Sequence, residues 1–134
     1  HRAGHCPADG WAGVAAIVEA QTWLDLETVC TSDITDMSPL FYSTQSFNQD
    51  IGSWDVSNVT DMYAMFYNAS SFNVDIGLWD VSNVNSMTGM FEQASSFNQD
   101  LSDWCVSQFS SEPNDFATGA DSWFEPQPIW GTCP

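Results

Sequence analysis

The stretch FNQDIGSWDVSNV at residues 47–59 returns as FNVDIGLWDVSNV at 72–84 and begins again as FNQDLSDWCVSQF at 97–109. Without gaps, residues 47–71 and 72–96 are identical at 17 of 25 positions. Residues 31–46 match the second half of an earlier copy. A repeat of this length is typical of a solenoid, in which each unit packs only on its neighbours. We therefore expect a stack of coils.

Each unit combines two periodicities. Met62, Met65, Phe66 and Ala69 would lie on one face of a helix, whereas residues 56–59 (VSNV) favour a short strand. The segment between helix and strand carries Asn, Asp and Gly, which suit turns. The sequence thus predicts an α/β repeat fold. It would be a short right-handed solenoid of about three coils, like the leucine-rich repeats, with a short parallel sheet and short helices.

Both ends of such a stack need covers, because a terminal coil exposes its apolar edge. Residues 1–30 contain an apolar stripe at helical spacing behind a candidate N-cap, Asp9, and predict a helical cap. The stripe consists of Trp11, Val14, Ile17, Val18 and Leu24. Residues 31–109 would form the solenoid of 25-residue units. Residues 110–134 lack the repeat, are rich in Pro and Trp, and predict an irregular C-terminal cap within the same compact domain.

Two aromatic positions recur in every copy, and we expect them to form a ladder through the core. They are Phe47, Phe72 and Phe97, and Trp54, Trp79 and Trp104. A surface platform for sugar is the alternative interpretation of the tryptophans. We favour burial, because each coil needs bulk and a Trp side chain buries about 150–250 Å².

The four cysteines predict two disulfides in an oxidising compartment. Cys30 and Cys105 occupy the same repeat position, three coils apart. At about 4.8 Å per coil they would be about 14 Å apart, beyond the roughly 7 Å limit for a disulfide. We therefore predict the pairs Cys6–Cys30 and Cys105–Cys133, each fastening one cap to the stack.

The sequence is strongly acidic: it has eighteen acidic residues and a single basic one, which gives a net charge of −17. This charge repels phosphate backbones and anionic lipids, so we expect no nucleic-acid partner and no membrane insertion. No apolar run is long enough for a membrane span. The start at His1 fits a mature product whose leader has been removed. We therefore expect a secreted, extracellular or cell-surface protein.

The unit FNxDIGxWDVSNVxxMxxMFxxASS resembles the repeat of BspA-like surface proteins, a divergent leucine-rich-repeat group of mycoplasmas, other bacteria and some eukaryotic microbes. The resemblance covers roughly residues 31–109, and Trp-Asp-Val-Ser-Asn-Val and Met-Phe recur together within it. It implies a secreted or surface-displayed module for adhesion or surface assembly, without catalytic residues. Only about three coils are present here, and the N-terminal helix has no counterpart in the family.

Stacked carboxylates raise the question of a bound cation. Asp50, Asp75 and Asp100 share one repeat position, and Asp55 and Asp80 share another. Calcium between coils is one interpretation. The favoured one is that each Asp accepts backbone N–H bonds in its own turn. No cofactor is required by any motif, and calcium is the one ion that the pattern suggests.

Other candidate chemistry is sparse. Asn58 and Asn68 begin N-glycosylation sequons. A copper site at His1 and His5 would need a further positioned histidine, so a flexible terminus is the simpler expectation. A glycosidase would need two positioned carboxylates, but the repeated aspartates suit a structural role. We expect no enzyme activity.

These observations favour a structural or interaction module that serves in adhesion, in a surface coat or in a self-assembled extracellular filament. The partner would be another protein or a second copy in head-to-tail contact. The alternative is a soluble secreted protein that binds glycan or calcium.

Overall fold

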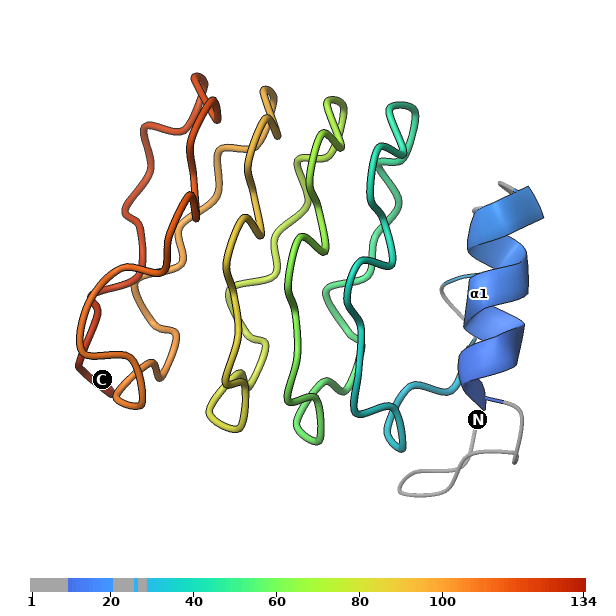
Figure 1. Cartoon of the computed structure of the whole chain (residues 1–134), viewed down its shortest axis with the longest axis horizontal. Coiled ribbons are helices and arrows are strands. Elements are labelled where there is room, and N and C mark those ends of the chain that lie inside the picture. Colours follow the sequence, from blue (N-terminus) through green and yellow to red (C-terminus); the bar gives the residue numbers. More distant parts are fainter. Residues whose placement is uncertain (1–9, 21–25, 27–28) are drawn as a thin grey trace.

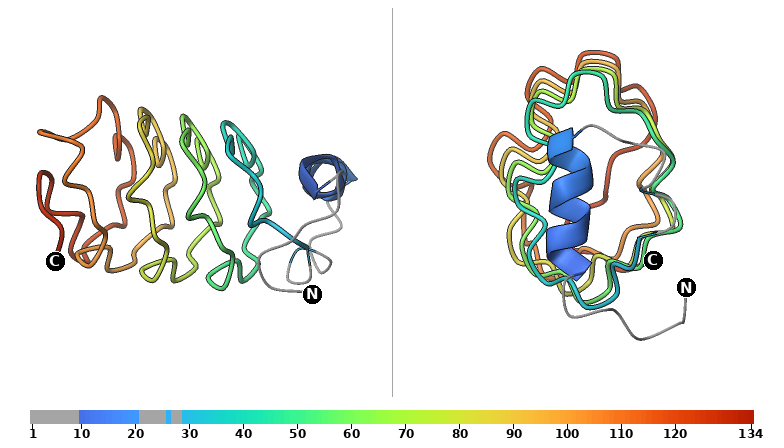
Figure 2. Two further views of the ribbon diagram at one scale, coloured as in Figure 1. Left: turned by 90° about the horizontal axis from the view of Figure 1, so that it is seen from below. Right: turned by 90° about the vertical axis from the view of Figure 1, so that its right-hand side faces the viewer.

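The structure is a computed structural model that describes residues 10–20, 26 and 29–134. Residues 31–134 wind into stacked coils, which we number from the N-terminal side as coil 1 (31–55), coil 2 (56–80), coil 3 (81–105) and the closing coil (106–134) (Figure 1). Helix α1 (Gly10–Ala20) lies beside coil 1 at one end of the stack. The two views in Figure 2 show that the coils superimpose along the stack axis and that α1 lies across its end.

The predicted α/β fold with a parallel sheet and a helix in each unit is wrong. In the described residues, α1 is the one α-helix, and β-structure is limited to two isolated parallel bridges, Asp36 to Asp61 and Asp61 to Ser86. The coils are built from consecutive turns, so the chain is a solenoid without a sheet. The leucine-rich-repeat comparison, which needs that sheet, does not hold.

The segment predicted to be helical is a chain of tight turns. The N–H groups of Met65, Tyr67 and Ala69 donate to the carbonyls three residues earlier. Ala64 and Asn68 have φ angles of 52° and 56°, which a right-handed helix does not permit. Consecutive turns repeat the 0, 3, 4, 7 spacing of apolar residues, and so the periodicity alone could not distinguish them from a helix.

The N–H groups that a helix would use internally point instead to the neighbouring coil. In coil 2 alternate residues donate forward, for example Met62 N–H to the Ser86 carbonyl at 2.9 Å and Asn68 N–H to that of Glu92 at 2.8 Å. Coil 1 donates to coil 2 and coil 3 to the closing coil in the same direction. We call this set of bonds the forward ladder. It satisfies the backbone without forming a sheet.

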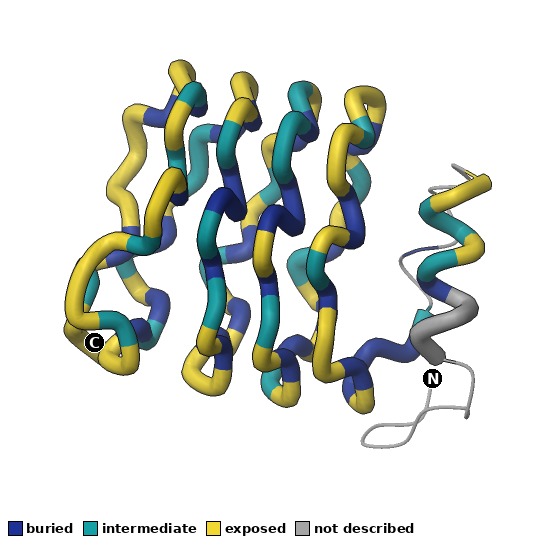
Figure 3. Tube along the Cα trace, viewed as in Figure 1, coloured by how far each residue is buried: buried dark blue, intermediate teal, exposed yellow. Residues whose placement is uncertain are grey.

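The interior of the stack is filled by the repeated apolar positions (Figure 3). Phe41, Phe66 and Phe91 stack from coil to coil, with ring centroids 5.5 and 5.4 Å apart. Helix α1 adds Val14, which is fully buried, to this core at the N-terminal end.

Residues 110–134 are not the irregular plug that we expected, because they continue the forward ladder as the closing coil. Gly89, Phe91 and Gln93 donate to the carbonyls of residues 114, 116 and 118 at 2.7–2.9 Å. The aromatic stack ends here: Phe116 meets Phe91 edge-on at 76° instead of stacking on it. An edge-on ring covers the face that a further coil would otherwise need to bury.

Candidate functional site

The aspartates at the first repeated position, which we call the first row, shape local turns of the chain. One carboxylate oxygen of each residue accepts the N–H of the residue two positions later at 2.9 Å. The pairs are Asp50 with Gly52, Asp75 with Gly77 and Asp100 with Ser102. This pattern is an Asx turn, which fixes the chain direction locally.

The second row does the same. Asp55 and Asp80 accept the N–H of Ser57 at 3.0 Å and of Ser82 at 3.1 Å, and each also accepts that serine's hydroxyl at 2.6 Å. Each of these carboxylates therefore accepts two hydrogen bonds within its own turn.

These carboxylates do not assemble into a metal site in the part of the chain that the structure describes. No group of three or more His, Cys, Asp or Glu side chains there could hold an ion. Asp75, Asp100 and Asp103 border one hollow of about 230 Å³, but the first two already use an oxygen in their own turns.

The local turn changes the pKa of the Asp100 carboxyl group. The hydroxyl of Ser102 donates to its carboxylate at 2.6 Å, and the Ser102 N–H donates at 2.9 Å. These two bonds, the hydroxyl first, hold the pKa of Asp100 below that of an ordinary aspartate, because they stabilise the charged form.

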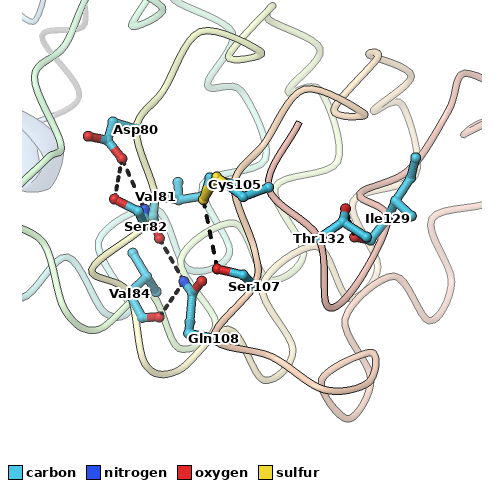
Figure 4. The surroundings of a disulfide bond; sticks show 10 residues. Asp80, Val81, Ser82, Val84, Cys105, Ser107, Gln108, Ile129 and Thr132 are labelled. Atoms are coloured by element: carbon cyan, nitrogen blue, oxygen red, sulfur yellow. Dashed lines mark hydrogen bonds between the residues drawn. A yellow bond between two sulfur atoms is a disulfide. The ribbon is translucent and has the colours of Figure 1, made fainter.

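Cysteine replaces aspartate where the stack meets its ends. Cys105 and Cys133 form a disulfide that closes the last coil, with their Cα atoms 4.0 Å apart. Figure 4 shows Cys105 beside Ser107, and Gln108 reaching back to coil 3, where its amide donates to the carbonyls of Val81 and Val84. Cys30 is also disulfide-bonded, and its predicted partner, Cys6, lies outside the described residues.

The two sequon asparagines differ in how firmly their side-chain amides are held. The amide of Asn58 donates to the Ser32 carbonyl at 2.6 Å, and Asn83 repeats this contact with Ser57 at 2.7 Å in the next coil. The amide of Asn68 has a longer contact, 3.4 Å to the Ser43 hydroxyl. A glycan on Asn58 would compete with a hydrogen bond that recurs from coil to coil. A glycan on Asn68 would displace only the long contact to Ser43.

The tryptophans of the repeat lie in the interior, where each one fastens its coil to the coil before. The indole N–H groups of Trp54, Trp79 and Trp104 donate to the carbonyls of Leu26, Ile51 and Ile76 at 3.0–3.1 Å. The rings are at most 6% exposed, so they offer no platform for sugar. Phe47, Phe72 and Phe97 form a second buried row with ring centroids 5.5 and 5.6 Å apart.

The forward ladder has an open end. The closing-coil positions that correspond to donors Gly89, Phe91 and Gln93 are Asp115, Ala117 and Gly119. Their N–H groups have no hydrogen-bond partner among the described residues. We call these three N–H groups the open donor row.

A hollow lies between coil 3 and the closing coil. It has a volume of about 370 Å³, is open to solvent, and is bordered by residues 85–88 and 108–114. Its walls carry hydroxyl and amide side chains above the buried Met87.

The chain was compared with known families, curated proteins and solved structures. The family described as "Mycoplasma protein of unknown function, DUF285" matches residues 14–125. The chain belongs to the DUF285 family. No curated protein and no solved structure matches it. The DUF285 description assigns no activity, so a function for this member has to be argued from its geometry.

Two features of this DUF285 chain were missed by the sequence analysis: the open donor row and the 370 Å³ hollow. Both depend on backbone hydrogen bonds between coils, which no residue pattern reports. Histidines 1 and 5, considered for copper, lie outside the described residues. No helix in the described part of the chain is long and apolar enough to cross a membrane.

Proposed function

We propose that this DUF285 chain is an extracellular interaction module that contributes to adhesion or to a surface coat by binding another protein at the open end of its stack. The Cys105–Cys133 disulfide supports an oxidising location. The resemblance to BspA-like surface proteins points the same way. The observation that carries the proposal is the open donor row, because unpaired backbone groups at an edge are a template for a further chain.

The direction of the ladder defines the partner. The open donor row consists of N–H groups, so a partner that pairs with it has to present a row of backbone carbonyls. Two copies joined through this end would bring donors against donors, which rules against a symmetric dimer there. The net charge of −17 further favours a partner with a basic face.

The opposite end argues against the self-assembled filament. Head-to-tail growth needs coil 1 to accept the open donor row of the next copy. Helix α1 lies against coil 1 at that end (Figure 2), and Val14, Ile17 and Val18 pack on the core there. A second copy would have to displace α1. We therefore favour a different protein as the partner, with the isolated chain a monomer.

Calcium is not favoured as an alternative function. The repeated aspartates already serve their own turns, and the described residues hold no group suited to a metal. Added chelator should therefore leave the melting temperature of the protein unchanged.

Site-specific photo-crosslinking tests the proposal. A photo-reactive residue would replace Phe124, which is 85% exposed on the closing coil, or Leu78, which is 93% exposed on coil 2. Each full-length variant is applied to intact surface material of the source organism. We expect a crosslinked protein from position 124 and none from position 78. Crosslinks from position 78 alone, or from neither, would refute binding at the open end.

Ala117→Pro provides the matched loss of function, because proline removes one N–H of the open donor row. Pro39 occupies the coil 1 ladder position that corresponds to Asp115, two residues before Ala117, and coil 1 forms with a proline in this row. Ala117→Ser keeps the N–H and is the control. We expect crosslinking from position 124 to be lost with proline and kept with serine. Equal crosslinking by both would show that the donor row is not used.

A further inference from the structure

The 370 Å³ hollow between coil 3 and the closing coil arises from an interruption of the ladder. Met37 N–H donates to the Asp61 carbonyl and Met62 N–H to that of Ser86, at 3.0 and 2.9 Å. Met87, at the same position in coil 3, makes no such bond to the described residues of the closing coil. Here the two coils separate.

One extra residue accounts for the separation. Bonds from coil 2 to coil 3 join residues 24 apart, such as Met62 and Ser86, whereas Gly89 bonds to Asn114, 25 residues later. The additional residue lies in the segment 110–113, which borders the hollow. The opening is therefore a consequence of chain length at this one place, because bonds from coil 1 to coil 2 also join residues 24 apart.

The walls carry hydrogen-bonding groups that the protein does not use. Gln108, at the edge of the hollow, donates its side-chain amide to the carbonyls of Val81 and Val84. Six other polar residues around the hollow make no side-chain hydrogen bond to another described residue. They are Ser86, Thr88, Ser110, Ser111, Glu112 and Asn114. The aspartates at the equivalent coil positions behave differently, since Asp36 and Asp61 each accept a backbone N–H at 2.9 Å. The hollow thus concentrates unpaired donors and acceptors in one place.

The chemistry of the walls selects a class of ligand. Glu112 is the one ionised side chain at the hollow, and together with the net charge of −17 it repels anions. A single carboxylate does not hold a metal ion. Hydroxyl and amide groups match a ligand that both donates and accepts. The half-buried ring of Phe109, held edge-on to Trp130 at 5.7 Å, adds an apolar surface.

We propose that this hollow binds one sugar residue, neutral or amino-substituted, at the end of a glycan chain. Sugars combine several hydroxyl groups with an apolar C–H face, which is the combination that the walls offer. The volume sets the length of the ligand, because protein ligand pockets range from about 300 to 1,000 Å³. A hollow of 370 Å³ accommodates a single ring and not a long oligosaccharide. The site would be present whether or not the open end binds a protein.

An NMR titration of the full chain tests the site, with the methyl glycosides of glucose, galactose, mannose, glucosamine and N-acetylglucosamine as probes. We expect at least one probe to cause saturable shifts of the backbone amides of residues 86–88 and 110–114, with a dissociation constant on the order of 1 mM. The absence of saturation with every probe would overturn the proposal, as would shifts that map elsewhere.

Two phenylalanine variants localise the binding. Ser111→Phe adds a ring to the wall of the hollow and should weaken binding at least about tenfold. Ser53→Phe is the matched control, because the equivalent position in coil 2 is Leu78, which is 93% exposed. It should bind like the unaltered protein. Equal affinities of the two variants would contradict the assigned location.

A third variant keeps the test decisive if Ser111→Phe does not fold. Asn114→Ala removes one side-chain amide that has no partner in the described protein, so the fold should be unaffected. We expect this variant to bind the sugar several-fold more weakly, with no change in unfolding free energy. Unchanged affinity in Asn114→Ala, alongside a misfolded Ser111→Phe, would also overturn the site.

Discussion

At the residue scale, the recurring tryptophan has two structural roles. Its ring fills the interior of a coil, and its N–H fastens that coil to the previous one, as Trp79 does with the Ile51 carbonyl at 3.1 Å. The sequence allowed us to predict the first role from bulk and repetition. The second could not be anticipated, because the acceptor is a backbone carbonyl 28 residues away that no residue type identifies.

Replacing Trp79 with Phe separates the two roles. Phenylalanine retains most of the buried ring but leaves the Ile51 carbonyl buried without its donor, which costs about 1–3 kcal/mol. We expect the free energy of unfolding in urea to fall by at least this amount. Tyr63→Phe, on a side chain that is 52% exposed, is the control and should change it by less than about 0.5 kcal/mol. Equal effects would contradict the anchoring role.

The Asp100 carboxylate provides a pH test of the turns. Its pKa is lowered by the Ser102 hydroxyl and N–H, so the charged form stabilises the folded state. That contribution is complete above the ordinary aspartate pKa of about 3.9 and is lost as the pH falls through the lowered value. In a carbon-13 NMR titration, Ser102→Ala should raise the pKa of Asp100 toward the ordinary value. An unchanged pKa would show that the hydroxyl is not the main cause.

At the element scale, the repeat length and the recurring apolar positions were accessible from sequence, but the secondary structure was not. Met62, Met65 and Phe66 have helical spacing, yet their segment is a chain of turns. The local signal for turns was weak, because Ala64 and Gln93 adopt positive φ without being typical turn residues. Hydrogen bonds to the next coil compensate for that cost, and they exist only once the stack has formed.

Close packing of the coils predicts unequal effects of two glycine substitutions. A Cβ at Gly52 would lie 2.5 Å from the Asp75 carbonyl oxygen of the next coil, whereas one at Gly77 would lie 3.0 Å from that of Asp100. Overpacking of this kind costs about 1–3 kcal/mol. We expect Gly52→Ala to lower the free energy of unfolding in urea more than Gly77→Ala does. The reverse order would show that the coils are not in this register.

At the scale of the whole molecule, the two ends of the stack differ. Helix α1 lies across the N-terminal end (Figure 2). The C-terminal end is closed in its interior by Phe116 and Trp123, whose rings meet the stacked phenylalanines edge-on, but its backbone edge stays open. Proline-rich composition suggested an irregular tail there, and the continuation of the ladder through residues 114–118 appears only in three dimensions.

The proposed function depends on this asymmetry, and backbone amide hydrogen exchange of the isolated full-length monomer measures it directly. The N–H groups of Gly89, Phe91 and Gln93 donate to the closing coil and should exchange slowly, since they open only when the coils separate. Those of Asp115, Ala117 and Gly119 should exchange at rates close to those of an unstructured chain. Equal protection of the two sets in the monomer would contradict the forward ladder and the open end that follows from it.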